Sequence, residues 1–273
     1  MARKLDMVFD VYLLAANSAI TCVDGVIGGA KEIFTDLIDI LKYQGRLIVE
    51  KNTLKKRRPK VLEQLIQMFK ALQANDWSEE EELGILNEVI WPLLQPESNE
   101  EETLEKSSTE QLPQQRTCYL AKIITLFNMW ISLEKFTHWF FLKNSKGETV
   151  LDWVKSVFTG TSVAEEFRRK LFSSVCRFVL VNSEGKKERL SDEFVNSLLS
   201  QFESWFQQKG KCKGGGFADL PARLAALSVI IGISRNSEIS EKIFFDNVIA
   251  YAARGQGEVQ TNAVVALNRY LIR

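Results

Sequence analysis

The sequence predicts an all-α protein organised as an elongated array of helix pairs, and three observations lead to this prediction. Apolar residues recur at the three- and four-residue spacing of amphipathic helices along almost the whole chain. The 273 residues include only 5 prolines and 15 glycines, which leaves few of the turns that a β-rich fold needs. Two sequence patterns also recur at intervals of 37 and 38 residues, close to the period of about 40 residues found in paired-helix repeats.

Residues 1–95 form an N-terminal helical part in this prediction. Two helices are expected near the N-terminus, and two more follow further along. Apolar stripes support these helices at 33–41, 61–72 and 83–93. Ser78 and Glu81 have the three-residue spacing of a capping box, so we expect the last of these helices to begin there.

Residues 96–114 are predicted to be an acidic, flexible loop or linker. The surrounding stretch 76–110 carries twelve acidic residues and one basic residue. Between Pro96 and Pro113 the large apolar residues are Leu104 and Leu112, too few to build a core. Clustered carboxylates can bind a metal, but nothing here fixes their geometry, and a solvated loop is the favoured interpretation.

Residues 115–273 are predicted to be a region of helical repeats, which brings the total to about ten helices. The expected helices lie at 115–142, 149–159, 163–181, 191–208, 219–234, 239–253 and 258–271. Ser162 and Glu165 form a second possible capping box.

Two recurrences support a repeat within this region. Asn144-Ser145-Lys146-Gly147 returns 38 residues later as Asn182-Ser183-Glu184-Gly185, although Asn, Ser and Gly are also ordinary turn residues. The stretch 222–230 is similar to 259–267, and Ala226 and Ala263 occupy the same point in the two copies. A small residue at that point allows two helices to approach each other closely.

The second recurrence resembles the HEAT-repeat family. The second helix of a HEAT unit typically reads V-R-x-x-A-x-x-A-L, and the matching residues here are Val259, Gln260, Ala263, Ala266 and Leu267. Gln260 replaces the family arginine, whereas the upstream copy keeps it as Arg223. The segment from Glu258 to Leu271 is also similar to repeats of condensin-type chromosome-organising subunits. The resemblance implies a HEAT/armadillo-like helical solenoid, an architecture that presents a long protein-binding surface.

A basic cluster interrupts the N-terminal part. It consists of Lys55, Lys56, Arg57, Arg58 and Lys60, with Pro59 disfavouring a helical conformation at Arg58. Three interpretations stay open: a nuclear import signal, a solvated loop between helices, and a patch that contacts nucleic-acid phosphates.

The sequence offers little for catalysis, metal binding or a cofactor. His138 is the one histidine, and it lies among aromatic residues that favour a packing role. The four cysteines are far apart and form no CxxC pair. The glycine-rich stretch 209–216 lacks the residue order of a phosphate-binding loop. We therefore expect no cofactor and no enzymatic activity, and rank an α-helical enzyme as the least favoured alternative.

These observations favour a non-catalytic scaffold that binds protein partners inside a larger nuclear assembly. A nucleic-acid-contacting subunit of a chromosome-organising complex is the alternative. The expected partner surface comprises Arg223, Gln260, Trp130, Trp139 and Trp153. The longest uncharged run near the N-terminus, 11–23, is shorter than the 20 or so residues of a membrane span, so we expect no membrane segment. Four cysteines without a signal peptide favour reduced thiols in an intracellular protein.

Overall fold

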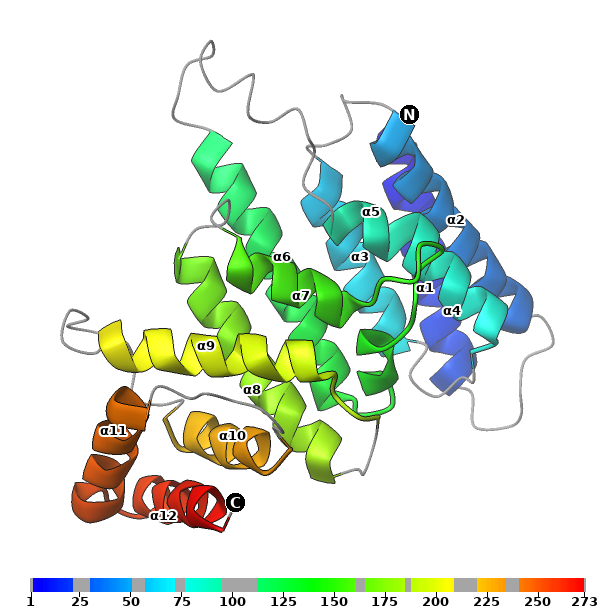
Figure 1. The fold of residues 1–273 in the computed structure, drawn as a ribbon. Helices are drawn as coiled ribbons and strands as arrows, with labels where there is room; N and C mark the ends of the chain where they lie inside the picture. Colours follow the sequence, from blue (N-terminus) through cyan, green and yellow to red (C-terminus); the bar gives the residue numbers. More distant parts are fainter. Residues whose placement is uncertain are drawn as a thin grey trace. The chain divides into compact units, whose positions relative to one another are not determined.

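A computed structural model places most of the chain and shows an all-helical protein (Figure 1). It describes residues 2–21, 30–50, 57–71, 77–94, 112–160, 165–184, 188–208, 220–233 and 241–272. In these ranges every regular element is a helix, and extended pairing is confined to an isolated bridge between Lys143 and Thr149. The prediction of an all-α fold is thereby confirmed.

The chain divides into two compact units. Unit 1 comprises Met1–Lys135 and Leu142–Thr149, and unit 2 comprises Phe136–Phe141 and Val150–Arg273. Helix α6 belongs to unit 1 and begins at Leu112, so the last three residues of the predicted linker 96–114 are helical. Residues 96–111 of that linker, and Ser162 of the second capping box, lie outside the described residues.

Helix α2 is central to unit 1. The elements of this unit are α1 (Ala2–Thr21), α2 (Ala30–Glu50), α3 (Arg58–Ala71), α4 (Glu79–Ile85), the π-helix η2 (Leu86–Ile90), α5 (Trp91–Leu94) and α6 (Leu112–Ser132). Helix α2 packs against α1, α3 and the continuous run α4–η2–α5, while α3 also packs against α1 and α6. The ring of Phe69 on α3 stacks on Trp77 and meets the edge of Trp130 on α6, with ring centroids 5.3 and 5.8 Å apart.

The start of α4 is the capping box that the sequence predicts. The Ser78 N–H donates to Glu81 Oε2 at 2.8 Å, and the Glu81 N–H donates to Ser78 Oγ at 3.3 Å. Further along this run the helix widens into the π-turn η2. Gly45 of α2 faces that turn so closely that a Cβ atom there would lie 1.9 Å from the Glu88 carbonyl oxygen. The absence of a side chain at residue 45 is therefore what lets α2 pack against η2.

Helices that are two apart in the chain pack together in unit 2. Its elements are the 3-10 helix η3 (Thr137–Phe140), α7 (Val150–Thr159), α8 (Glu165–Glu184), α9 (Asp192–Gln208), α10 (Leu220–Ile233), α11 (Glu241–Arg254) and α12 (Glu258–Leu271). Helix α9 packs against α7 and α11, and α10 packs against α8 and α12. The two series meet where α9 contacts α10 and where α11 contacts α12.

The single helix predicted over 115–142 is wrong after Ser132. Helix α6 ends at Ser132, and Glu134 adopts a φ of 27°, a conformation that a continuing right-handed helix does not use. The aromatic segment beyond it folds as η3, with Phe136, Trp139 and Phe140 buried. These aromatic residues fit the apolar period of the preceding helix in the sequence, but in the structure they bury the separate 3-10 helix η3 in the core.

The two Asn-Ser copies occupy different backbone settings. Asn144 lies in a loop that also contains Gly147 at φ 80°, whereas Asn182 lies in the last turn of α8. Both asparagines are buried, and each amide bonds to the loop that follows it: Asn144 Oδ1 accepts from the N–H of Glu148 at 2.9 Å, and Asn182 Nδ2 donates to the Glu188 carbonyl at 2.9 Å. The two asparagines therefore both hold the loop that follows them, but the backbone around them is not repeated.

Candidate protein-binding surfaces

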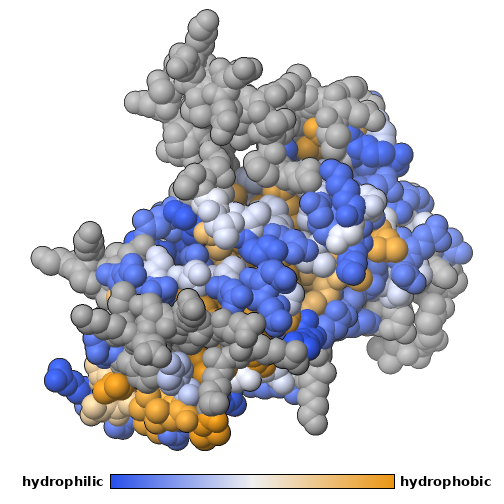
Figure 2. Space-filling model, viewed as in Figure 1, coloured by the Kyte–Doolittle hydropathy of each residue, from blue (hydrophilic) through white to orange (hydrophobic). Residues whose placement is uncertain are grey.

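The last two helices carry a set of exposed apolar side chains, which we call the C-terminal apolar face. Its members are 37–84% exposed: Ile249, Val264, Val265, Leu271 and Ile272. Figure 2 shows hydrophobic side chains gathered over α11 and α12 at the lower left. Exposed charges of both signs, including Asp246, Arg254 and Arg269, lie on the same two helices. Exposed apolar side chains with charged residues on the same helices suit a protein–protein interface.

This face is exposed because α12 is held to the protein by small residues. The buried residues of α12 are Ala263 and Ala266, and α12 packs chiefly against α10 and α11. Polar bonds complete the contact with α10: Asn262 Nδ2 donates to the Pro221 carbonyl at 3.1 Å, and Arg269 donates to the Ser228 carbonyl at 2.9 Å. Three larger apolar residues of α12, Val264, Val265 and Leu271, are left exposed.

The two similar stretches of sequence, in α10 and α12, differ in burial at one place. Ala226 and Ala263 are both completely buried, as their equivalent places in the two copies predict. The next residue differs: Leu227 in α10 is buried, whereas Val264 in α12 is exposed. Helix α10 has neighbours on both sides, α8 and α12. Helix α12 itself packs chiefly against α10 and α11, and Val264 stays exposed.

Arg223 does not form an open partner surface. Its guanidinium lies over the rings of Phe172 and Trp205, with the guanidinium carbon 5.2 and 4.9 Å from their centroids. It also donates to Ser173 Oγ at 2.7 Å. These contacts join α10 to α8 and α9, so Arg223 stabilises the packing of helices within unit 2.

Gln260 lies on the surface, as expected, but it has a local role as well. Its amide Nε2 donates to the Ala252 carbonyl at 3.0 Å. The bond ties the first turn of α12 to the last turn of α11 across the tight connection at Gly255 and Gly257.

The three tryptophans proposed as partner anchors are buried. Trp130 and Trp139 are 0% exposed and Trp153 is 8% exposed. Trp130 stacks on Phe127 with ring centroids 5.5 Å apart, which places it in the core of unit 1. The expectation of an exposed anchor at these residues is corrected: the rings build the interior.

The described part of the basic cluster is engaged within unit 1. Arg57 forms an ion pair with Asp6, and Arg58 is buried with its guanidinium 5.6 Å from the ring centroid of Tyr119. Lys60 is half-buried in the first turn of α3, and Lys55 and Lys56 lie outside the described residues. The two arginines therefore stabilise the fold, which removes them from the set of free cations that a phosphate patch needs.

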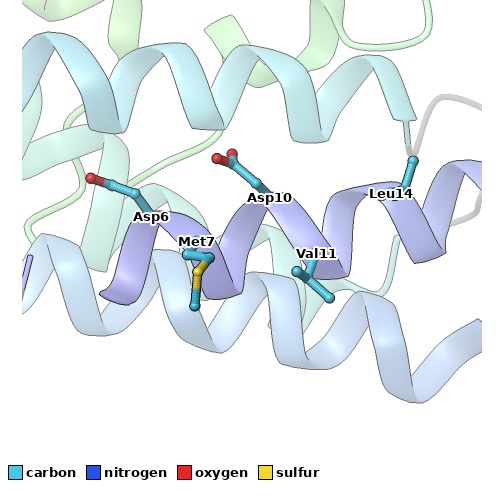
Figure 3. A pocket seen from close by; sticks show the side chains of 5 residues that line it. All are labelled: Asp6, Met7, Asp10, Val11 and Leu14. Carbon is cyan, nitrogen blue, oxygen red and sulfur yellow. The ribbon is translucent and has the colours of Figure 1, made fainter. Parts of the chain in front are cut away.

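A second apolar surface, which the sequence reasoning missed, lies on α1. Met7, Val11 and Leu14 are 64%, 61% and 68% exposed, and we call them the Met7 stripe. With Asp6 and Asp10 they line a shallow hollow along the helix. Figure 3 shows the two aspartates leaving one side of α1 and Met7 and Val11 leaving the other. The 7, 11, 14 spacing was available in the sequence, but only burial of Phe9 shows which side of α1 faces inward.

Among the ionisable groups of the described residues, Glu166 has a shifted pKa. Lys170 donates to Glu166 across one helical turn at 2.9 Å, and this bond, followed by the charge of Lys170, lowers the pKa of the Glu166 carboxyl. Both side chains are exposed on α8. His138 is half-buried beside Trp139, with ring centroids 6.2 Å apart. Within the described ranges, no group of three or more His, Cys, Asp or Glu side chains is arranged to hold a metal ion.

Comparison with known proteins gives no relative: no family model, no curated protein and no solved structure matches this chain. Among the described helices, none combines the length and the hydropathy needed to cross a membrane.

Proposed function

We propose that this protein is a non-catalytic helical-repeat scaffold whose C-terminal apolar face binds a helical segment of a partner protein. The observation that carries the proposal is the difference between Leu227, buried in α10, and Val264, exposed at the equivalent place in α12. The alternation of neighbours in unit 2, with α10 between α8 and α12, supports a HEAT/armadillo-like stack. The mechanism is occupancy: the partner helix extends the stack and is thereby positioned.

The chemistry of the partner follows from the face. Val264, Val265 and Ile249 offer branched apolar side chains for ridge-into-groove packing, so the partner needs an apolar helical face of its own. The charged residues of both signs on α11 and α12 then favour a partner helix with positive and negative side chains beside its apolar face. A nuclear setting stays a prediction from residues 55–60.

A photo-crosslinking experiment on the full chain tests this proposal. A benzoylphenylalanine placed at Asn268, which is exposed on α12, should crosslink to a helical segment of another protein in cells. The same group at Glu184, exposed at the end of α8, is the matched control. The Asn268 crosslink should disappear in a Val264→Glu variant, whose new charge would have to be buried in the interface.

Two results would contradict the proposal. One is a crosslink at Asn268 that persists in Val264→Glu while circular dichroism shows an unchanged fold. The other is a crosslinked peptide that has no helical apolar pattern.

A further inference from the structure

The Met7 stripe has the spacing of a helix–helix seam. Its residues are separated by four and then three positions, the interval at which apolar residues recur along one side of a coiled coil. In that heptad arrangement Val11 takes an a position and Met7 and Leu14 take d positions. Phe9, on the opposite side of α1, is completely buried in unit 1, so the stripe points away from the core. Helix α1 therefore has one face for its own unit and one for another helix.

The charges beside the stripe select the partner. Asp6 is engaged by Arg57 and by Gln64, whose Nε2 donates to it at 3.2 Å. Asp10 is exposed and takes the g position next to Val11, while Lys4 takes the a position one turn before Met7. In coiled coils the e and g positions determine which helices pair.

Pairing of α1 with a second copy of itself is disfavoured by these charges. In a parallel pair the two Lys4 side chains would face each other across the seam, and in an antiparallel pair the two Asp10 carboxylates would be neighbours. Like charges in such positions destabilise a pair, so they favour a different helix as the occupant.

We propose that the Met7 stripe binds an amphipathic helix of another protein, one with an apolar seam of four- and three-residue spacing and with Lys or Arg opposite Asp10. This site is separate from the C-terminal apolar face and does not depend on the function proposed for that face. The stripe spans only two turns, so the bound helix is held by a few apolar contacts, and the cation opposite Asp10 adds selectivity between partners.

Fluorescence anisotropy with designed peptides tests the proposal on the full chain. The probe is a fluorescein-labelled synthetic peptide of roughly 20 residues, long enough for several helical turns. It carries Val and Leu on the seam and Lys at the flanking positions, and a twin peptide carries Glu in place of each Lys. At low salt the wild-type chain should bind the Lys peptide about tenfold more tightly than the Glu peptide.

Two variants separate the contributions of the apolar seam and of Asp10 to peptide binding. Val11→Asp should weaken binding of the Lys peptide about tenfold or more, because a carboxylate would enter the apolar seam. Asp10→Lys should reverse the preference, so that the Glu peptide binds more tightly. Glu184→Lys, which makes the same charge change at an exposed residue of α8, should leave the preference as it is in the wild type.

Three outcomes would overturn the inference. They are equal binding of the two peptides by the wild-type chain, an unchanged preference in Asp10→Lys, and full binding by Val11→Asp with an unchanged circular dichroism spectrum. Sedimentation of the wild-type chain with phosphatidylcholine vesicles, abolished in Val11→Asp, would also overturn it, because the stripe would then be a lipid-contacting surface.

Discussion

The guanidinium of Arg223 makes three contacts at once, with Phe172, Trp205 and the Ser173 hydroxyl. We predict that Arg223→Lys lowers the free energy of unfolding by about 1–2 kcal/mol, since an ammonium group cannot keep the planar fork between two rings. Urea denaturation followed by circular dichroism measures this loss.

Arg254→Lys is the matched control for that experiment. Arg254 is exposed in the last turn of α11, and the substitution there should change the free energy of unfolding by less than about 0.5 kcal/mol. Equal effects of the two substitutions would mean that the aromatic contacts of Arg223 do not stabilise unit 2.

Glu166 offers a pH prediction at the scale of one carboxyl group. Its pKa is lowered in the folded protein, first by the hydrogen bond from Lys170, so the interaction is present at neutral pH and is lost as the pH falls through the lowered pKa. Lys170→Ala should move the Glu166 pKa back toward its ordinary value, as measured by NMR titration of the side-chain carboxyl. Arg169→Ala should move it less, because the charge of Arg169 is the smaller cause. A larger shift in Arg169→Ala would contradict this order.

The contact between α2 and the π-helix gives a prediction about an element. In Gly45→Ala the added methyl would meet the Glu88 carbonyl oxygen at 1.9 Å, and backbone atoms cannot step aside cheaply. We expect this variant to lose about 1–3 kcal/mol of stability, as overpacked contacts do. Urea denaturation of the full chain measures the loss.

Gly84→Ala is the matched substitution on the other side of the same contact. There the new methyl would meet only the end of the Lys42 side chain at 2.7 Å, which is flexible and can move. Because alanine is also a better helix former than glycine by about 1 kcal/mol, this variant should be neutral or slightly more stable. A stable Gly45→Ala variant would show that α2 and η2 separate easily.

Across the whole molecule, local signals predicted the helices well, and their assembly was harder to foresee. The periodicity predicted α7 to α12 to within a few residues, because most of these helices have an apolar face and a polar face, and α10 is apolar almost all round. The turn at Glu134 was missed because the aromatic residues beyond it also fit a helical period. The π-turn η2 was not predicted, and its close contact with Gly45 joins residues that are distant in the sequence.

The candidate surfaces were also hard to predict, because they depend on tertiary contacts that the sequence does not show. Arg223 was assigned to a surface because a family motif gives the residue and not its neighbours, and Phe172 and Trp205 enclose it only after folding. The tryptophans were assigned as anchors because their size suits both a core and an interface, and burial decides between the two. The Met7 stripe required knowledge of which side of α1 meets α2 and α3.

The small buried residues of α12 also bear on the local stability of this helix. An alanine methyl contributes on the order of 1 kcal/mol when buried, and α12 buries Ala263 and Ala266, whereas α8 buries Phe167, Phe172 and Phe178 among others. Amide hydrogens of α12 should therefore exchange with deuterium through local opening, sooner than those of α8. A helix bound over Val264 would slow that exchange, so mass spectrometry of deuterium uptake would report a ligand at this end of the protein before the ligand is identified.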